Sequence, residues 1–104
     1  MANSRRLDLD NAFRSILGSK NVYFRAPESK KMNYPAIKYK LSGMDEKHAD
    51  NFNYLNTREY EVIHIGKDPD TDIVEKMLKH FDKCRFVRRY EQDNLIHDVF
   101  YLYW

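Results

Sequence analysis

Apolar residues recur at helical spacing in the first part of the chain, between residues 7 and 17. The residues that carry this spacing are Leu9, Phe13, Ile16 and Leu17. Side chains three or four positions apart share one face of a helix, so the segment predicts an amphipathic helix. Ser4 or Asp8 is expected to cap its start, and Gly18 is expected to end it.

A second segment with helical spacing follows an acidic run in the chain. Its apolar positions are Ile73, Met77, Leu78 and Phe81. The run Asp68-Pro69-Asp70-Thr71-Asp72 stands just before it. Carboxylates at a helix start can bind its free amides and interact favourably with its dipole. We therefore expect a helix capped by these acidic residues and about as long as the first.

The remaining apolar residues lie in short segments typical of β-strands. These segments are residues 21–25, 36–41, 57–65, 84–90 and 95–103. In the second of them Ile37, Tyr39 and Leu41 point one way and Lys38 and Lys40 the other, which predicts a strand with one solvated face. The third has apolar residues on both faces, so we expect a strand that is covered on both sides.

Two polar stretches connect these elements. Residues 91–94 form a short polar turn, which predicts a C-terminal hairpin over 84–104. Residues 42–56 show no sustained period and predict a long loop or extended arm. The chain of 104 residues has room for one domain, 1–104. The order of elements predicts an α+β fold, with two helices packed on one face of a largely antiparallel sheet of about four to five strands.

Aromatic residues are abundant, with eight Tyr, six Phe and one Trp making up 14% of the chain. Periodicity assigns one group to the core: Phe13, Tyr39, Tyr60, Phe81, Phe86 and Phe100. A second group has no obvious place inside: Tyr34, Phe52, Tyr54 and some of Tyr101, Tyr103 and Trp104. We expect these excess rings to be covered by a partner.

Charge and cysteine content narrow the class of protein. A formal net charge of +2 is too balanced for a dedicated nucleic-acid binder. The single Cys84 cannot form an intramolecular disulfide and fits a reducing, cytoplasmic compartment. The N-terminal residues lack the apolar stretch of a signal peptide, and no apolar run approaches the roughly 18 residues of a membrane span.

Metal chemistry is not expected from the acidic run or from the histidines. The spacing of Asp68, Asp70 and Asp72 resembles the start of a calcium loop, but Ile73 and Lys79 stand where that loop needs Gly and Glu. Histidines and the cysteine show no paired ligand spacing: His48, His64, His80, His97 and Cys84. We therefore predict no metal or cofactor.

Catalytic constellations are also weak. His48 and Asp50 could form an acid/base pair, but two polar residues at that spacing are common in loops. Cys84 has no neighbouring base and is better interpreted as a core residue. The chain has no phosphate loop, nucleophile elbow or dinucleotide fingerprint. We expect a protein that is not an enzyme.

Basic residues interleave with aromatic ones in the segment 85–90. Strict alternation places Arg85 and Arg89 with Val87, and Arg88 on the other face with Phe86 and Tyr90, so no basic stripe is predicted. His97 shares a face with Val99 and Tyr101 and is expected to be half-buried with one hydrogen-bond partner. A second basic group could face DNA or an acidic rim, or simply solvent: Lys30, Lys31, Lys38 and Lys40.

Several short motifs together resemble the tail terminator, or tail completion, proteins of long-tailed phages. The motifs are Tyr34-Pro35-Ala36-Ile37-x-Tyr39, His48-Ala49-Asp50-Asn51, Arg58-x-Tyr60-x-Val62, Asp68-Pro69-Asp70-Thr71-Asp72-Ile73, Cys84-Arg85-Phe86 and Asp93-Asn94-Leu95-Ile96-His97-x-Val99-Phe100-x-Leu102-Tyr103. The similarity extends over roughly residues 30–104.

The resemblance implies a structural protein of the virion, assembled in the host cytoplasm. Such proteins form a ring, usually a hexamer, that caps the tail tube, meets the head connector and lets DNA pass without reading its sequence. Residues expected at an interface with a neighbouring subunit or the tube are Tyr34, His48, Asp50, Asn51, Phe52, Tyr54, Asp68 and Asp70. The alternative is a small nucleic-acid-binding module or toxin-like ribonuclease that uses Arg85–Arg89 and His97.

Overall fold

The computed structural model describes residues 2–25, 31–42 and 58–104 of the chain. Its elements are α1 (Ala2–Leu17), β1 (Val22–Phe24), β2 (Ala36–Leu41), β3 (Glu59–Gly66), α2 (Ile73–His80), β4 (Cys84–Gln92) and β5 (Leu95–Tyr103). The strands form one sheet in the order β1-β2-β3-β5-β4. Among the described strands, only the β1–β2 pair is parallel. The predicted α+β fold with a largely antiparallel sheet is confirmed.

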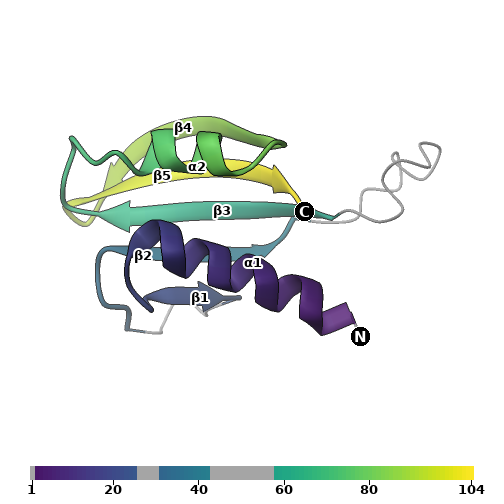
Figure 1. Cartoon of the computed structure of the whole chain (residues 1–104). Coiled ribbons are helices and arrows are strands. Elements are labelled where there is room, and N and C mark those ends of the chain that lie inside the picture. The colour runs from purple at the N-terminus through teal and green to yellow at the C-terminus, as the bar shows by residue number, and fades with distance from the viewer. Residues whose placement is uncertain (1, 26–30, 43–57) are drawn as a thin grey trace.

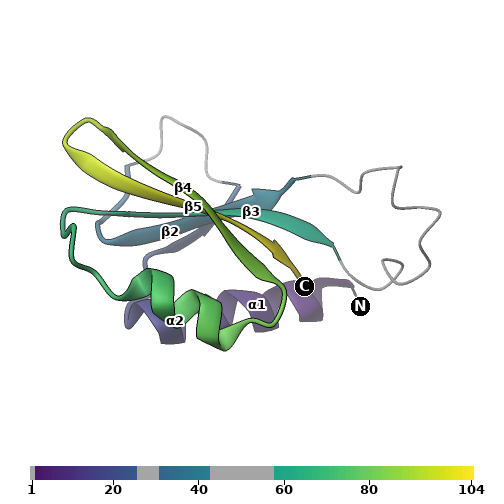
Figure 2. The same ribbon diagram turned by 90° about the horizontal axis from the view of Figure 1, so that it is seen from above.

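Both helices lie on the same face of the sheet, as Figures 1 and 2 show. In the part of the chain that the structure describes, no helix covers the opposite face, which we call the open face. Directly opposed residues of paired strands point to the same face of a sheet. The register therefore assigns Tyr39, Val62 and Phe100 to the helix side, and Lys38, Ile63 and Val99 to the open face.

The core lies between the helices and the sheet. It is built from Leu9 and Phe13 of α1, Ile73 and Met77 of α2, and the helix-side residues of the strands. Aromatic rings meet edge to face at its centre, with the Phe13 ring centroid 4.9 Å from that of Tyr39. Such pairs add to the stabilisation from burial, so the ring cluster fixes how α1 sits on the sheet.

A buried hydroxyl links α1 to β2. The Tyr39 hydroxyl donates a hydrogen bond of 2.8 Å to the Asp10 carboxylate. Burial raises the pKa of Tyr39 well above its usual range, and the Asp10 carboxylate raises it further. Tyr39 therefore stays protonated near neutral pH and can donate this bond.

Five of the six rings assigned to the core are buried, and the sixth is not. Phe86 is 37% exposed at the outer strand β4, although its ring contacts Phe100 edge to face at 5.6 Å. The prediction for Phe86 is wrong because β4 is an edge strand, which no helix covers completely. Trp104, left unassigned by its periodicity, packs against the core next to Phe81, with ring centroids 5.8 Å apart.

The two helices differ in length, contrary to expectation. The first has 16 residues and the second 8. Helix α2 ends before Phe81 because the backbone of Phe81 is extended. The Phe81 ring is buried in the core. Gly18 ends α1 as predicted, with φ of +75° and its amide donating to the Arg14 carbonyl at 2.9 Å.

The predicted helix caps are mostly wrong. Ser4 and Asp8 lie inside α1, which begins earlier than its apolar pattern. Asp72 occupies the N-cap position of α2, but its side chain makes no capping hydrogen bond. Its neighbour Thr71 instead accepts the amide of Ile73 at 3.3 Å.

The C-terminal hairpin is confirmed, with a tighter turn than expected. Asp93 and Asn94 alone connect the strands, with φ of +57° and +63°. These two residue types tolerate left-handed backbone conformations, which a two-residue hairpin turn of this kind requires. Gln92 and Glu91 therefore continue β4 instead of forming part of the turn.

An irregularity in β4 overturns the predicted faces of its arginines. The pairing shifts between Phe86 and Arg88, so that Arg88 opposes Val99 and Arg89 opposes Asp98. The prediction assumed strict alternation of side chains along residues 85–90, with no extra residue in the strand. With Val87 as the extra residue of a β-bulge, Arg88 joins Arg85 on the open face and Arg89 turns to the helix side.

Candidate functional site

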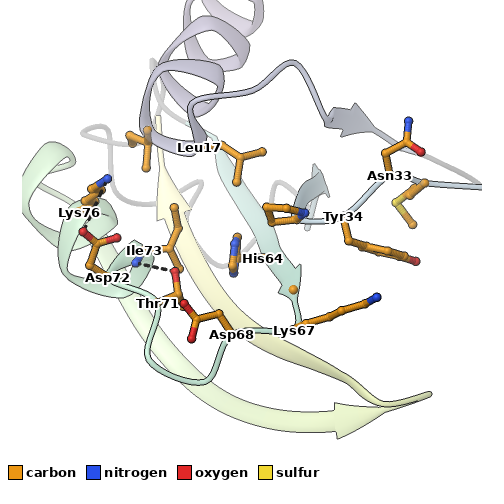
Figure 3. Close-up of a pocket in the computed structure, with 14 residues that line it drawn as sticks. Leu17, Asn33, Tyr34, His64, Lys67, Asp68, Thr71, Asp72, Ile73 and Lys76 are labelled. Carbon is orange, nitrogen blue, oxygen red and sulfur yellow. Dashed lines mark hydrogen bonds and ion pairs between the residues drawn. The ribbon is translucent and has the colours of Figure 1, made fainter.

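A pocket of about 530 Å³ opens at one end of the sheet. We call it the His64 pocket. Its walls come from the end of α1, the residues before β2, the end of β3 and the loop that leads to α2, as Figure 3 shows. Six of its residues are Leu17, Tyr34, Pro35, His64, Asp68 and Ile73. Four separate segments of the chain therefore converge on it.

His64 is the buried polar residue of this pocket. It lies on β3, opposite Ile37 of β2 and Asp98 of β5, and is only 5% exposed. Its Nδ1 atom is buried without a hydrogen bond and lies 3.8 Å from the Asp98 Oδ2 atom. Burial lowers the pKa of His64, and the Asp98 carboxylate only partly opposes this shift. The imidazole is therefore neutral near pH 7.

A carboxylate and a guanidinium stand behind this imidazole. Asp98 is completely buried and receives two hydrogen bonds from Arg89, of 2.7 Å from Nε and 3.3 Å from Nη2. The hydrogen bond to Asp98 raises the pKa of Arg89, so the guanidinium stays charged. Arg89 also donates to the carbonyl of Pro69 at 3.0 Å. It therefore ties β4 and β5 to the loop that forms one pocket wall.

Gly66 leaves the outer edge of the imidazole open. A Cβ atom at this position would lie 3.4 Å from His64 Cε1, 3.9 Å from His64 Nε2 and 3.5 Å from the Cβ of Pro35. It would therefore take up space between the ring and the wall. Gly66 is not in a left-handed conformation, and these distances are those of ordinary van der Waals contact.

The rim of the pocket combines charges of both signs. Lys67, Asp68, Asp72 and Lys76 line it. Asp72 and Lys76 pair with each other at 3.6 Å, and Asp68 accepts the amide of Asp70 at 2.9 Å. The rim therefore has no net charge. The pocket suits an apolar group that carries one hydrogen-bond donor, since a neutral imidazole whose Nδ1 proton faces Asp98 presents Nε2 as an acceptor.

The structure brings together two of the residues predicted for an interface. Tyr34 is 40% exposed at one side of the pocket, and Asp68 lies at its rim. Asp70 is exposed in the same loop. The other five predicted interface residues lie outside the described residues: His48, Asp50, Asn51, Phe52 and Tyr54.

The basic residues predicted to face DNA, an acidic rim or solvent do not form one cluster with the predicted interface residues. Lys31 is exposed, Lys38 is half-buried on the open face, and Lys40 pairs with Glu61 at 3.7 Å. Lys30 lies outside the described residues.

Sequence reasoning missed His64, Asp98 and Arg89 as a group. His64 and Asp98 stand at positions whose neighbours two residues away are buried and apolar. The available signal was a His and an Asp at strand positions whose alternation places their side chains on the core side. Arg89 had no such signal, because only the bulge turns it toward Asp98.

The open face carries a second cluster, which we call the ring–arginine patch. The Arg85 guanidinium lies 5.7 Å from the Tyr101 ring centroid, and that of Arg88 lies 5.1 Å from the ring centroid of Tyr90. Tyr90 in turn stacks on His97 at 4.7 Å. The half-buried position of His97 is confirmed, and its Nδ1 atom lies 3.1 Å from the Leu95 carbonyl oxygen.

Two further features concern the described residues only. Cys84 is half-buried against the core, and burial raises the pKa of its thiol to about 11, which confirms its interpretation as a core residue. Within ranges 2–25, 31–42 and 58–104, no three His, Cys, Asp or Glu side chains gather as metal ligands would. No helix found there is long and apolar enough for a membrane span.

Comparisons with known proteins identified no similar protein. The chain matches no protein family, and neither curated proteins nor solved structures gave a match.

Proposed function

We propose that this chain is a tail terminator of a long-tailed phage, a protein that forms a ring on the end of the tail tube. The ring, a hexamer in our proposal, stops growth of the tube and offers a surface to the head connector. DNA passes through its lumen without sequence recognition. The protein acts by position and has no turnover.

The observation that carries the proposal is the distribution of the uncovered surfaces. Ring contacts are heterologous, so each subunit needs two different surfaces that fit one another. Both helices lie on one face of the sheet, so that no helix of the described residues lies on the open face or along the edge strand β4. The His64 pocket forms another, separate surface at the end of the sheet. These surfaces, together with the motif resemblance, support an assembly role.

Exposed apolar side chains on the edge strand agree with contact between subunits. Phe86 and Val87 of β4 are 37% and 39% exposed. A strand edge with such side chains can pair with a neighbour unless it is covered. In a ring, each copy would cover this edge of the next.

The proposal is tested by co-sedimentation of the purified protein with tail tubes. We expect the chain to sediment with the tubes as a ring and to stay bound at moderate salt. A Val87→Lys variant places a charge on the uncovered edge and should sediment with the tubes at least several-fold less, whereas Lys79→Glu on exposed α2 should behave as the wild type. A wild-type chain that stays in the supernatant would contradict the proposal.

A second function, a single-stranded nucleic-acid-binding module, is favoured by the ring–arginine patch. Single-strand binding combines stacking rings with cations that contact phosphate, and the β4 bulge gathers both kinds of residue on the open face. Its acidic neighbours Glu59 and Glu61 share this face and weaken the attraction. Steep loss of oligonucleotide binding with salt, absent in an Arg85→Ala/Arg88→Ala variant, would favour this function over assembly.

A further inference from the structure

Side chains from two strands flank the buried carboxylate of Asp98 on β5. Both His64 of β3 and Arg89 of β4 stand directly opposite Asp98 in the sheet. The Asp98 Oδ1 atom accepts the short hydrogen bond of 2.7 Å from Arg89 Nε. The Oδ2 atom accepts the longer bond of 3.3 Å from Arg89 Nη2, and His64 Nδ1 lies 3.8 Å from this same oxygen. Asp98 Oδ2 therefore stands between two nitrogens that can compete for it.

The Nδ1 atom of His64 is buried without a hydrogen bond in this arrangement. Buried polar atoms almost always have a partner, and 3.8 Å is too long for a bond to Asp98. Protonation of the imidazole changes the balance, because both ring nitrogens then carry a hydrogen and the ring carries a full positive charge. The Nδ1–H group then faces a carboxylate oxygen, and a movement of about 1 Å brings the two within bonding distance.

The protonated site contains two cations and one carboxylate. The exposed fraction of His64 is only 5%, whereas that of the Arg89 side chain is 38%. A charge that is removed from water needs a charged or hydrogen-bonding partner, while an exposed guanidinium can be hydrated instead. His64 is therefore the cation that keeps Asp98, and Arg89 is the cation that can turn to solvent.

Arg89 also holds the loop that forms one wall of the His64 pocket (Figure 3). Its Nη1 atom donates a hydrogen bond of 3.0 Å to the carbonyl of Pro69. Two other hydrogen bonds to side chains of this loop join residues within 68–73. Among the described residues, the bond from Arg89 is thus the one hydrogen bond that connects residues 67–71 to the sheet. An Arg89 side chain that turns to solvent gives up this connection.

We propose that His64, Asp98 and Arg89 form an acid-sensitive switch that holds residues 67–71 against the sheet at neutral pH and releases them in acid. The imidazole takes up one proton from solvent, and its Nδ1–H group then donates to Asp98 Oδ2. Arg89 leaves Asp98 and the Pro69 carbonyl, and the wall of the pocket opens. Burial lowers the pKa of His64 more than Asp98 raises it, so the change occurs below about pH 6.5. The switch goes beyond the ring proposed above and does not depend on it.

Other titratable groups surround His64 and have to be separated from it. Besides His64 itself, the titratable residues that line the pocket are Tyr34, Lys67, Asp68, Asp72 and Lys76. Asp72 and Lys76 pair with each other at 3.6 Å. The pKa of Arg89 is raised by the hydrogen bond to Asp98 and, less strongly, by the nearby charge of Asp70. All of these groups remain in a His64→Gln chain, so this variant separates their titration from that of the imidazole.

NMR relaxation of the wild-type chain between about pH 7.5 and pH 4.5 tests the switch. Ring nitrogen shifts report the protonation of His64, and amide order parameters report the motion of the loop. We expect the order parameters of residues 67, 68, 70 and 71 to fall from about 0.85 to below about 0.6 as His64 takes up its proton. Order parameters that stay constant through this titration would overturn the proposal. The same holds for a His64 that takes up no proton while the chain stays folded.

Three variants check the cause of the motion. His64→Gln keeps a polar side chain that cannot become a cation, so the loop should stay ordered over the whole pH range. Arg89→Lys keeps the charge but removes the fork that reaches Pro69, so the loop should already be mobile at neutral pH. Arg85→Lys is the matched control, because Arg85 lies on the open face of the same strand, and its loop should behave as in the wild type. A loop that loosens in acid in His64→Gln, or stays ordered at neutral pH in Arg89→Lys, would overturn the proposal.

Discussion

The buried pair of Asp98 and Arg89 provides the sharpest prediction about stability. Asp98 is completely buried, and its two oxygens accept hydrogen bonds of 2.7 and 3.3 Å from Arg89. Substitution of Arg89→Met keeps much of the aliphatic volume and removes the guanidinium. The Asp98 carboxylate then remains buried without the guanidinium that compensates its charge.

The expected cost follows from burial. Removing one partner of a buried ion pair typically costs 3–5 kcal/mol, because the remaining charge is not compensated. The Arg89 side chain is 38% exposed, so water can partly replace it, and we expect about 3 kcal/mol. For a domain of this size that loss corresponds to a fall in melting temperature of roughly 12–20 °C.

A double-mutant cycle checks the cause as well as the size. Asp98→Asn removes the charge, so the double variant Arg89→Met/Asp98→Asn should be at least about 1 kcal/mol more stable than the sum of the single effects predicts. The lost hydrogen bond to Pro69 is common to both Arg89 variants and cancels in the cycle. Urea unfolding is followed by fluorescence of Trp104, the single tryptophan, which packs on the core. Additive effects would refute the electrostatic reasoning.

Three further predictions concern pH, backbone and thiol chemistry. Because the pKa of His64 is lowered in the native protein, the unfolded chain binds a proton below about pH 6.5 that the native chain does not. The free energy of unfolding of the wild type should therefore fall with decreasing pH. A pH series of urea unfolding should show a smaller fall in the His64→Gln variant. Gly18→Ala should cost about 1–2 kcal/mol in thermal unfolding, since φ of +75° is unfavourable with a Cβ, and an unchanged melting temperature would contradict this. Cys84 should react with a thiol reagent at pH 8 at least tenfold more slowly in the native protein than in urea, because its pKa is raised to about 11, and equal rates would show an accessible thiolate.

The fold could be predicted from the sequence because its elements carry strong periodic patterns. Residues 36–41 alternate cleanly, and the structure has a strand over the same residues. The hairpin and both helices also follow from their apolar spacing. Boundaries were less accurate, as α1 begins at Ala2, before any apolar repeat. Tertiary packing decided the rest, since Phe81 leaves its helix to fill the core.

The candidate site was predictable only in part. Tyr34 and Asp68 came from motifs, and both line the pocket. His64 and Asp98 lie far apart in the sequence and meet through the order of the strands, which periodicity does not determine. Arg89 reaches Asp98 through a bulge of one residue, which no local pattern announces. The pairs of Asp98 with His64 and with Arg89, which depend on strand register, could therefore not be predicted from the sequence alone.

Tail-tube length is the measurement that tests the terminator proposal most directly. Purified tube protein is polymerised with and without an equimolar amount of this chain, and tube lengths are measured by electron microscopy. The proposal predicts that tubes grow long without the chain, stop growing when it is added, and carry a ring at one end. Tubes that keep growing with the chain present, without an end ring, would contradict the account.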